Sequence, residues 1–140
     1  MRQVMPEGWT LPALDRRNEA FFTEGRLLVQ RCAGCGTVQH PPEDVCHRCM
    51  GEAFELRECA GTGTVYSYTV AHRAPHPVFV EQLPLIVAIV ELEEGPRLVT
   101  NLVGCEPGEL EVGMAVEAIF EPIDDTDVVL PVFTPRRGPG

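Results

Sequence analysis

Four cysteines in two matched pairs are the residues whose spacing most clearly implies chemistry. Cys32 and Cys35 form one C-x2-C pair, and Cys46 and Cys49 form a second pair that begins eleven positions after Cys35. Two such turns can point four thiolates at one position, which is the tetrahedral site that structural Zn²⁺ occupies, with Zn–S distances of about 2.3 Å. Four protein ligands leave no open position for water or substrate, so the zinc is expected to be structural.

Two disulfides are the alternative for these cysteines, and they need an oxidising compartment. The first ten residues, Met1–Thr10, lack the apolar segment of a secretory signal. The longest apolar run, Leu85–Val90, is far too short to span a membrane. In a reducing cytosol, paired C-x2-C motifs favour metal over disulfide. We therefore expect a cytoplasmic protein with no membrane segment, whose cysteines bind Zn²⁺.

Two histidines and two further cysteines are also possible metal ligands by residue type. His47 lies inside the second pair and His40 lies between the pairs, so either can replace a cysteine as a metal ligand. Four well-spaced cysteines make such a replacement unnecessary. Cys59 and Cys105 lie outside the pattern, and we expect both to be small buried residues.

The charge of the chain argues against a nucleic-acid partner. The 140 residues carry 11 basic side chains, all of them arginine, against 21 acidic ones, for a net charge of -10. Proteins that bind nucleic acid normally present a basic face that displaces counterions from the phosphates. A nucleic-acid-binding zinc-ribbon and barrel module is thus an alternative that the composition disfavours.

Turn signals and hydrophobic patterns divide the chain into four parts. Residues 10–25 are predicted to form one helix, capped by Thr10 and ended by Gly25, with a stripe of Leu11, Leu14, Phe21 and Phe22 that is either core or a docking surface. Residues 26–58 are predicted to form a zinc ribbon, residues 59–135 a β-domain, and residues 136–140 a flexible tail. The β-domain has five predicted strands, which fit a small OB-type barrel: 64–70, 85–91, 97–103, 114–120 and 128–133.

The first and second of these strands have different patterns. Alternation in the first strand places Tyr66, Tyr68 and Val70 on one face. The second strand, Leu85–Glu91, is apolar almost throughout and is predicted to be buried on both faces.

No known catalytic pattern is present. The chain has no G-x-S-x-G, P-loop or G-x-G-x-x-G sequence. His72, Arg73 and His76 follow the first barrel strand and can form an acid–base pair, an anion site or simply a solvated loop. An independent small acyltransferase or hydrolase is therefore the least supported function.

The order of the motifs is similar to that of a known family. Phe21-Phe22 precedes Gln30-Arg-Cys-Ala-Gly-Cys-Gly36, and Cys46-x-x-Cys49 precedes the long motif Gly61-Thr-Gly-Thr-Val-Tyr-Ser-Tyr-Thr-Val-Ala-His-Arg73. The later motifs are Val87-Ala-Ile-Val-Glu-Leu92 and Leu130-Pro-Val-Phe133. This chain resembles the DUF35 family from about residue 12 to residue 135. The resemblance implies a mostly β fold: an N-terminal helix, a rubredoxin-like zinc ribbon and a five-stranded OB-fold barrel.

The resemblance also implies a helper subunit without catalytic residues of its own. Members of the family pair with a thiolase-superfamily protein and help to hold or channel a CoA thioester. Their partners include thiolases, acyltransferases and aldolases that shorten steroid side chains. We therefore expect a hetero-oligomer with a thiolase-like protein, with acyl-CoA as the shared substrate. The candidate CoA-binding residues are Tyr66, Tyr68, His72, Arg73, His76 and Arg97.

Overall fold

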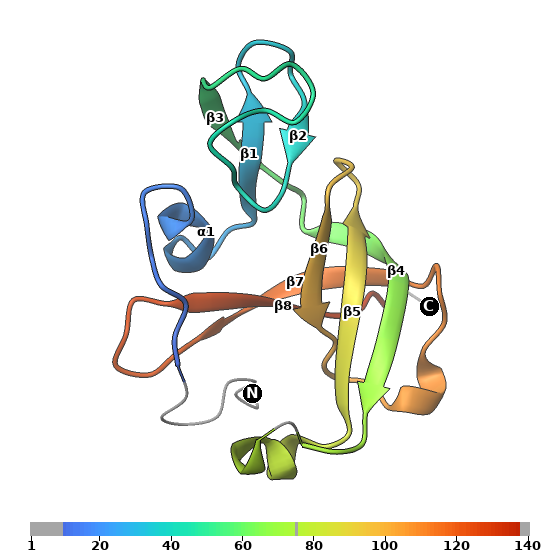
Figure 1. Ribbon diagram of the computed structural model, residues 1–140. Helices are drawn as coiled ribbons and strands as arrows, with labels where there is room; N and C mark the ends of the chain where they lie inside the picture. The colour runs from blue at the N-terminus through green and yellow to red at the C-terminus, as the bar shows by residue number, and fades with distance from the viewer. Residues whose placement is uncertain (1–9, 75, 138–140) are drawn as a thin grey trace.

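The computed structural model describes residues 10–74 and 76–137, which are folded mainly as β-strands (Figure 1). A small three-stranded sheet comes first, with antiparallel strands in the order β2-β1-β3. Its strands are β1 (Leu28–Cys32), β2 (Val38–Gln39) and β3 (Phe54–Glu58). Cys32 ends β1 and the other three cysteines of the two pairs lie in the connecting loops, so this sheet is the expected ribbon.

A larger sheet follows, with five strands in the order β6-β5-β4-β7-β8. Its strands are β4 (Thr62–Ala71), β5 (Leu85–Leu92), β6 (Arg97–Asn101), β7 (Ala115–Pro122) and β8 (Val129–Pro135). The 3-10 turn η1 (Pro77–Gln82) connects β4 to β5, and η2 (Pro107–Glu109) lies between β6 and β7.

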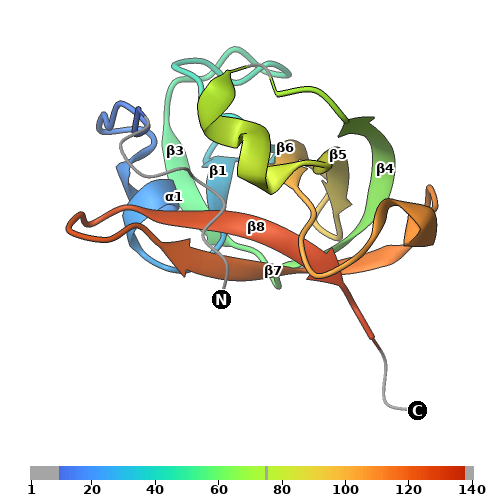
Figure 2. The ribbon, with the colours of Figure 1, turned by 90° about the horizontal axis from the view of Figure 1, so that it is seen from below.

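The larger sheet curls until its two outer strands meet (Figure 2). Leu102, just after β6, forms a parallel bridge with Phe133 of β8. The Thr100 hydroxyl donates to the Pro131 carbonyl oxygen at 3.3 Å. The result is a nearly closed five-stranded barrel, which confirms the predicted mostly β fold of a zinc ribbon followed by an OB-type barrel.

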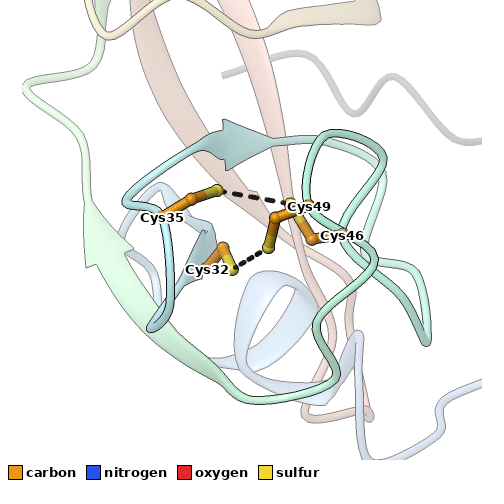
Figure 3. Close-up of side chains that lie close together, drawn as sticks. All are labelled: Cys32, Cys35, Cys46 and Cys49. Atoms are coloured by element: carbon orange, nitrogen blue, oxygen red, sulfur yellow. Dashed lines mark hydrogen bonds between the residues drawn. The ribbon is translucent and has the colours of Figure 1, made fainter.

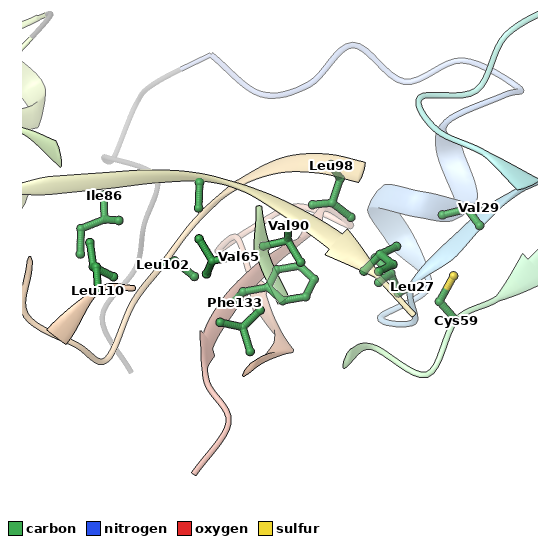
Figure 4. Packing of buried hydrophobic residues seen from close by; sticks show 13 residues of the cluster. Leu27, Val29, Cys59, Val65, Ile86, Val90, Leu98, Leu102, Leu110 and Phe133 are labelled. Carbon is green, nitrogen blue, oxygen red and sulfur yellow. The ribbon is translucent and has the colours of Figure 1, made fainter. Parts of the chain in front are cut away.

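One hydrophobic core joins the two sheets (Figure 4). Phe133, Val65 and Val90 are at most 1 % exposed at its centre. Leu27 and Val29, from the start of the ribbon, belong to the same cluster. The ribbon is therefore attached to the barrel by shared packing as well as by the chain that links them.

β5 is buried on one face only, in contrast to the prediction. Its even-numbered residues, Ile86 to Leu92, are at most 4 % exposed, whereas the residues between them are half-buried. The inner face lies in the barrel. The outer face is left partly open because, among the described residues, no second layer covers it.

The predicted helix over residues 10–25 is much too long. The observed helix α1 spans Glu19–Thr23 only, and Thr10 does not cap it. The Asp15 carboxylate instead accepts hydrogen bonds from the backbone N–H groups of Arg17 and Asn18, which holds residues 15–18, just before α1, in a turn. No helix in the described part of the chain has the length and hydropathy needed to cross a membrane.

The residues of the predicted stripe separate once the helix is shortened. Leu14 is 43 % exposed, whereas Phe21 packs against the core and its ring meets Phe22 edge-on at 5.0 Å. At the other end of the chain, Arg136 donates its N–H to Ala115 at 2.9 Å, so the predicted flexible tail 136–140 begins with a bonded residue. Residues 138–140 lie outside the described residues.

A β-bulge overturns the predicted faces of β4. The pairing with β5 shifts between Val65 and Ser67, so Tyr66 is an extra residue there. Tyr68 lies opposite Ala88, which is 1 % exposed, and therefore shares the inner face of the sheet. Tyr66 contacts Arg97 on the outer face. The two tyrosines thus lie on opposite faces, because one inserted residue reverses the alternation.

The turn between β5 and β6 fastens the linker between the two modules. The Glu94 carboxylate accepts the Ala60 N–H at 2.9 Å, and Glu93 donates its N–H to Thr62 at 3.1 Å. Cys59 is buried beside this contact; its burial, and then the Glu94 carboxylate, raise the pKa of its thiol to about 12. Cys59 is the small buried residue that the sequence predicts.

His40 links the N-terminal segment to the ribbon and gives the fold a specific response to pH. Its ring stacks on Phe21 with centroids 4.7 Å apart, and burial lowers the pKa of its imidazole to about 4. Folding therefore disfavours the protonated form. The stability gained from neutral His40 is present above the unfolded pKa of 6.5, and it is lost as the pH falls towards 4.

We expect His40→Phe to remove this part of the pH dependence. Between pH 6.5 and pH 4, the wild-type chain should lose up to about 3 kcal/mol more unfolding free energy than the variant. Urea unfolding followed by circular dichroism, with excess zinc at every pH, measures the difference. Parallel pH profiles of the two proteins would show that protonation of His40 does not destabilise the fold.

Candidate metal centre and candidate ligand-binding residues

The four predicted cysteines converge at one point of the ribbon (Figure 3). Their sulfur atoms all lie within 4.8 Å of one another. The Cys32–Cys49 and Cys35–Cys46 sulfurs are 3.5 and 3.7 Å apart. Sulfurs at the corners of a tetrahedron with Zn–S bonds of about 2.3 Å lie about 3.8 Å apart. Both the donor type and the spacing therefore fit a tetrahedral zinc ion.

Each cysteine pair is shaped by a tight turn. Gly36 donates its N–H to the Cys32 carbonyl oxygen, and Met50 donates to that of Cys46, both at 2.9 Å. Gly36 has a φ of 79°, and Met50 has a φ of 66° although it carries a side chain. Gly51 follows, and a Cβ atom there would lie 3.2 Å from the Cys49 sulfur. Gly36 thus allows a left-handed backbone in the first turn, and Gly51 leaves space beside a thiol in the second.

The thiols differ in how readily they lose a proton. Hydrogen bonds from the Thr37 hydroxyl and backbone lower the pKa of Cys35 to about 6, and the Cys35 backbone N–H lowers that of Cys32. The Gly51 N–H also lowers the pKa of Cys49. The hydrogen bonds of the Cys49 thiol with the Cys32 and Cys35 sulfurs have a larger, opposite effect, and the pKa of Cys49 is raised to about 11. Metal binding must displace the remaining protons, so zinc affinity falls as the pH falls.

Histidine does not enter the metal site. The group of ligand atoms within 4.8 Å consists of the four cysteine sulfurs and includes neither His40 nor His47. Cys105, outside the pattern, is only half-buried, and burial raises the pKa of its thiol.

Two buried glutamines brace the loop that carries the second cysteine pair, and sequence reasoning missed them. The Gln39 amide donates to the Gln30 side-chain oxygen at 2.7 Å and accepts the N–H of His47 at 3.1 Å. Gln30 donates to the Glu43 carbonyl oxygen at 2.7 Å and accepts its N–H at 3.0 Å. The only sequence signal was two amide side chains nine residues apart, flanking the first pair.

Two of the predicted CoA-binding residues form a cluster on the outer face of the barrel. The Arg97 guanidinium carbon lies 3.7 Å from the centre of the Tyr66 ring, and its Nε donates to the Glu91 carboxylate at 2.9 Å. Arg97 also lines a cleft of about 760 Å³ between the ribbon and the β5–β6 turn. Glu43 and Asp44 line the same cleft. The positive charge of Arg97 is therefore balanced mainly by Glu91, since Asp44 is paired with Arg17.

The other four candidates lie elsewhere. Tyr68 faces inward and is 38 % exposed, and His72 and Arg73 are exposed just beyond the end of β4. His76 caps η1 by accepting the Val78 N–H on its Nδ1 at 3.2 Å. Seven residues of extended chain would separate Tyr66 from Arg73 by about 20 Å. The structure thus brings together only Tyr66 and Arg97 of the predicted set.

The geometry defines a two-module protein, a zinc ribbon followed by an OB-fold barrel. Family models agree: residues 22–55 match "ChsH2, rubredoxin-like zinc ribbon domain" and residues 56–121 match "ChsH2, C-terminal OB-fold domain". The chain is 42 % identical over 100 residues to a DUF35 domain-containing scaffold protein of Methanocaldococcus jannaschii, covering 71 % of this chain and 70 % of that one. The protein belongs to the DUF35 family.

Two further similarities extend over most of the chain. It is 48 % identical over 128 residues to a probable enoyl-CoA hydratase alpha subunit of Thermomonospora curvata, which covers 89 % of this chain and 39 % of that protein. The chain therefore spans about two fifths of the length of that relative. A solved chain described as "Ltp2-ChsH2(DUF35) aldolase" superposes with a TM-score of 0.78 at 49 % identity, covering 89 % of this chain and 98 % of that one.

We expect the purified chain to contain about one Zn²⁺, and Cys46→Ser to lose it. Cys46 is fully buried, so the variant should also lose the fold of the ribbon, while the barrel strands keep much of their structure. Metal analysis together with amide hydrogen exchange measures both effects. A zinc-free wild-type chain with a folded ribbon would contradict the assignment.

We expect Gln39→Leu to weaken zinc binding without removing a ligand. The variant leaves the His47 N–H without its partner and removes one of the two donors to the Gln30 side-chain oxygen, so the second cysteine pair should be less well positioned. Loss of such supporting contacts typically lowers metal affinity about 10–100-fold. Competition with a chromogenic chelator measures it, and Gln82→Leu in η1 is the matched control. Equal affinity in both variants would exclude a supporting role for Gln39.

Proposed function

We propose that this chain is a non-catalytic subunit of a complex that processes acyl-CoA thioesters. A thiolase-like partner would make or break the C–C bond, as a thiolase, an acyltransferase or a retro-aldolase, and this chain would help to bind or channel the thioester. The observation that carries the proposal is the match to nearly the whole DUF35 chain of the Ltp2-ChsH2(DUF35) aldolase.

The names of the relatives support a CoA thioester as the shared substrate. Besides the T. curvata relative, a Mycobacterium tuberculosis protein named 3-oxo-4,17-pregnadiene-20-carboxyl-CoA hydratase alpha subunit is 34 % identical over 123 residues. The name of this second relative also supports a steroid side chain as one class of acyl group. The complex would be a cytoplasmic hetero-oligomer.

The charges of the arginines distinguish the candidate CoA contacts. Arg73 is exposed and forms no ion pair within the described residues, whereas Arg97 is paired with Glu91. Arg73, with His72 beside it, is therefore the better ligand for a CoA phosphate. Tyr66 and Arg97 would offer a flat surface for the adenine or pantetheine. The exposed Leu14 and Leu56 support the N-terminal segment and the ribbon as partner contacts.

The isolated chain should turn over no acyl-CoA. Four of its six cysteines are gathered at a closed metal site, and burial, together with the Glu94 carboxylate, raises the pKa of the Cys59 thiol to about 12, which makes Cys59 a poor nucleophile at neutral pH. Thioester consumption by the pure chain and by the co-purified complex is the comparison. Robust turnover by the chain alone, or a partner equally fast without it, would refute the helper role. Tight, salt-sensitive binding of single-stranded DNA would favour the nucleic-acid alternative.

Arg73→Ala should raise the KM of the complex for CoA substrates about 5–10-fold and leave kcat nearly unchanged, if Arg73 holds a phosphate equally in ground and transition states. Arg137→Ala, exposed after the end of β8, is the matched control because it also removes one arginine charge and lies outside the proposed ligand and partner contacts. Steady-state kinetics of both complexes tests this. Equal KM values would remove Arg73 from the CoA site.

A further inference from the structure

A cavity of about 390 Å³ lies where β5 begins and β6 ends, beside the β7–β8 pair. Its volume is typical of sites for small ligands. None of the described residues that line it is charged, although 23 % of the chain is. A charged molecule would lose its hydration there without gaining an ion pair. Six of the lining side chains are apolar: Pro84, Leu85, Ile86, Leu102, Val103 and Ile119.

The core and the backbone hold the walls of this cavity in place. Ile86 and Leu102 are 4 % exposed and belong to the core of the barrel (Figure 4). Val103 donates its backbone N–H to a carbonyl oxygen of β8 at 2.9 Å. Gly104 then passes so close to β8 that a Cβ atom there would lie 2.8 Å from the Thr134 hydroxyl oxygen. The cavity is therefore formed before any ligand binds, and a ligand need not open it.

Two polar side chains provide hydrogen-bonding positions in the cavity. The Asn101 amide donates to the Ile86 carbonyl oxygen at 3.0 Å, which orients its side chain. Neither the Asn101 side-chain oxygen nor the Thr134 hydroxyl has a hydrogen-bond partner in the part of the chain that the structure describes. A ligand carbonyl can therefore accept a hydrogen bond from Thr134, and a ligand hydroxyl can donate to Asn101.

Water fills such a cavity poorly. At about 30 Å³ each, about a dozen water molecules correspond to its volume, and a well-held water makes 2–4 hydrogen bonds. The described lining offers four polar side chains, so many of these waters would contact apolar walls: Gln82, Asn101, Cys105 and Thr134. An apolar molecule that displaces poorly ordered water gains affinity.

We propose that this cavity binds an uncharged, mainly apolar molecule that carries one carbonyl or hydroxyl oxygen. Its apolar body lies against Ile86, Leu102 and Ile119, and its oxygen bonds to Thr134 or Asn101. The absence of charge among the described lining residues makes the site select against an analogue of the same length that carries a carboxylate.

The proposed function would produce a molecule of this class. When a retro-aldolase cleaves a β-hydroxyacyl-CoA, the bond between the α and β carbons breaks. The β-hydroxyl gives up its proton and becomes a carbonyl, while the α carbon keeps the electron pair and takes up a proton. One product is a shorter CoA thioester, which keeps every phosphate, and the other is an uncharged ketone or aldehyde. Identifying the ligand as this second product rests on the proposed function, whereas the binding itself does not.

Backbone amide chemical shifts of the zinc-loaded, isotope-labelled chain test the proposal. The probes are 2-octanone, which is uncharged, and octanoate, which has the same number of carbons and one negative charge. Titration from about 0.1 to about 3 mM covers the affinities expected of such small ligands. The amides of Asn101, Gly104 and Cys105 shift with 2-octanone and do not shift with octanoate.

A matched pair of variants places the ligand in the cavity. Ile119→Phe adds a ring to a half-buried wall residue and raises the dissociation constant of 2-octanone at least about tenfold, because close-packed interiors leave no room for both. Ile89→Phe makes the same exchange at a half-buried position on the outer face of β5, away from the cavity, and binds like the wild type. Zinc content and circular dichroism show that both variants are folded.

A third variant tests the hydrogen bond without adding volume. Thr134→Val keeps the branched shape of the side chain and removes its hydroxyl, so it weakens 2-octanone binding about 3–10-fold.

Three results would overturn the proposal. The first is the absence of shifts at the cavity amides over the whole titration with 2-octanone. The second is equal binding of 2-octanone and octanoate. The third is an Ile119→Phe variant that binds as tightly as Ile89→Phe. None of these results bears on the proposed function, because thioester turnover by the complex is measured separately.

Discussion

The convergence of four sulfur atoms on one metal-sized position is the constraint on which the rest of the molecule depends. The ribbon has three short strands and few buried residues of its own, so thiolate–metal bonds must supply much of its folding free energy. The same module places Leu27 and Val29 in the core of the barrel. Metal binding in the ribbon is thus coupled to the packing of the barrel, although all four candidate ligands belong to the ribbon.

A second consequence concerns the cleft between the modules. The Glu94 carboxylate and the Thr62 carbonyl oxygen fasten the β5–β6 turn to the linker, close to the shared core. The side of the cleft formed by Arg97 is therefore held at a fixed position opposite the side formed by the second cysteine loop. Because that loop is in turn braced by Gln30 and Gln39, the shape of the cleft depends on zinc, on two buried amides and on one carboxylate.

The sequence predicts the parts of this structure that depend on local spacing. Two C-x2-C pairs identify the metal ligands, and alternating strands identify the barrel, because both patterns repeat within a few residues. The prediction of a helix over residues 10–25 was wrong because the Asp15 side chain accepts hydrogen bonds from backbone N–H groups that a longer helix would use. The bulge at Tyr66 and the contact between Gln30 and Gln39 were not predictable, because each depends on the register in which two strands pair, β4 with β5 and β1 with β2.

The bulge also decides how a ligand can use the barrel. Without it, Tyr66 and Tyr68 would form one aromatic surface, and a single CoA molecule could contact both. With it, Tyr66 and Arg97 belong to the outer face, near the ribbon, and Tyr68 belongs to the inner face. A CoA thioester that stacks on Tyr66 must therefore run along the outside of β4 to bring a phosphate to Arg73, about 20 Å away. On that path it would pass Ser67 and Thr69 of the outer face, whereas Tyr68, on the inner face, would take no part in the contact.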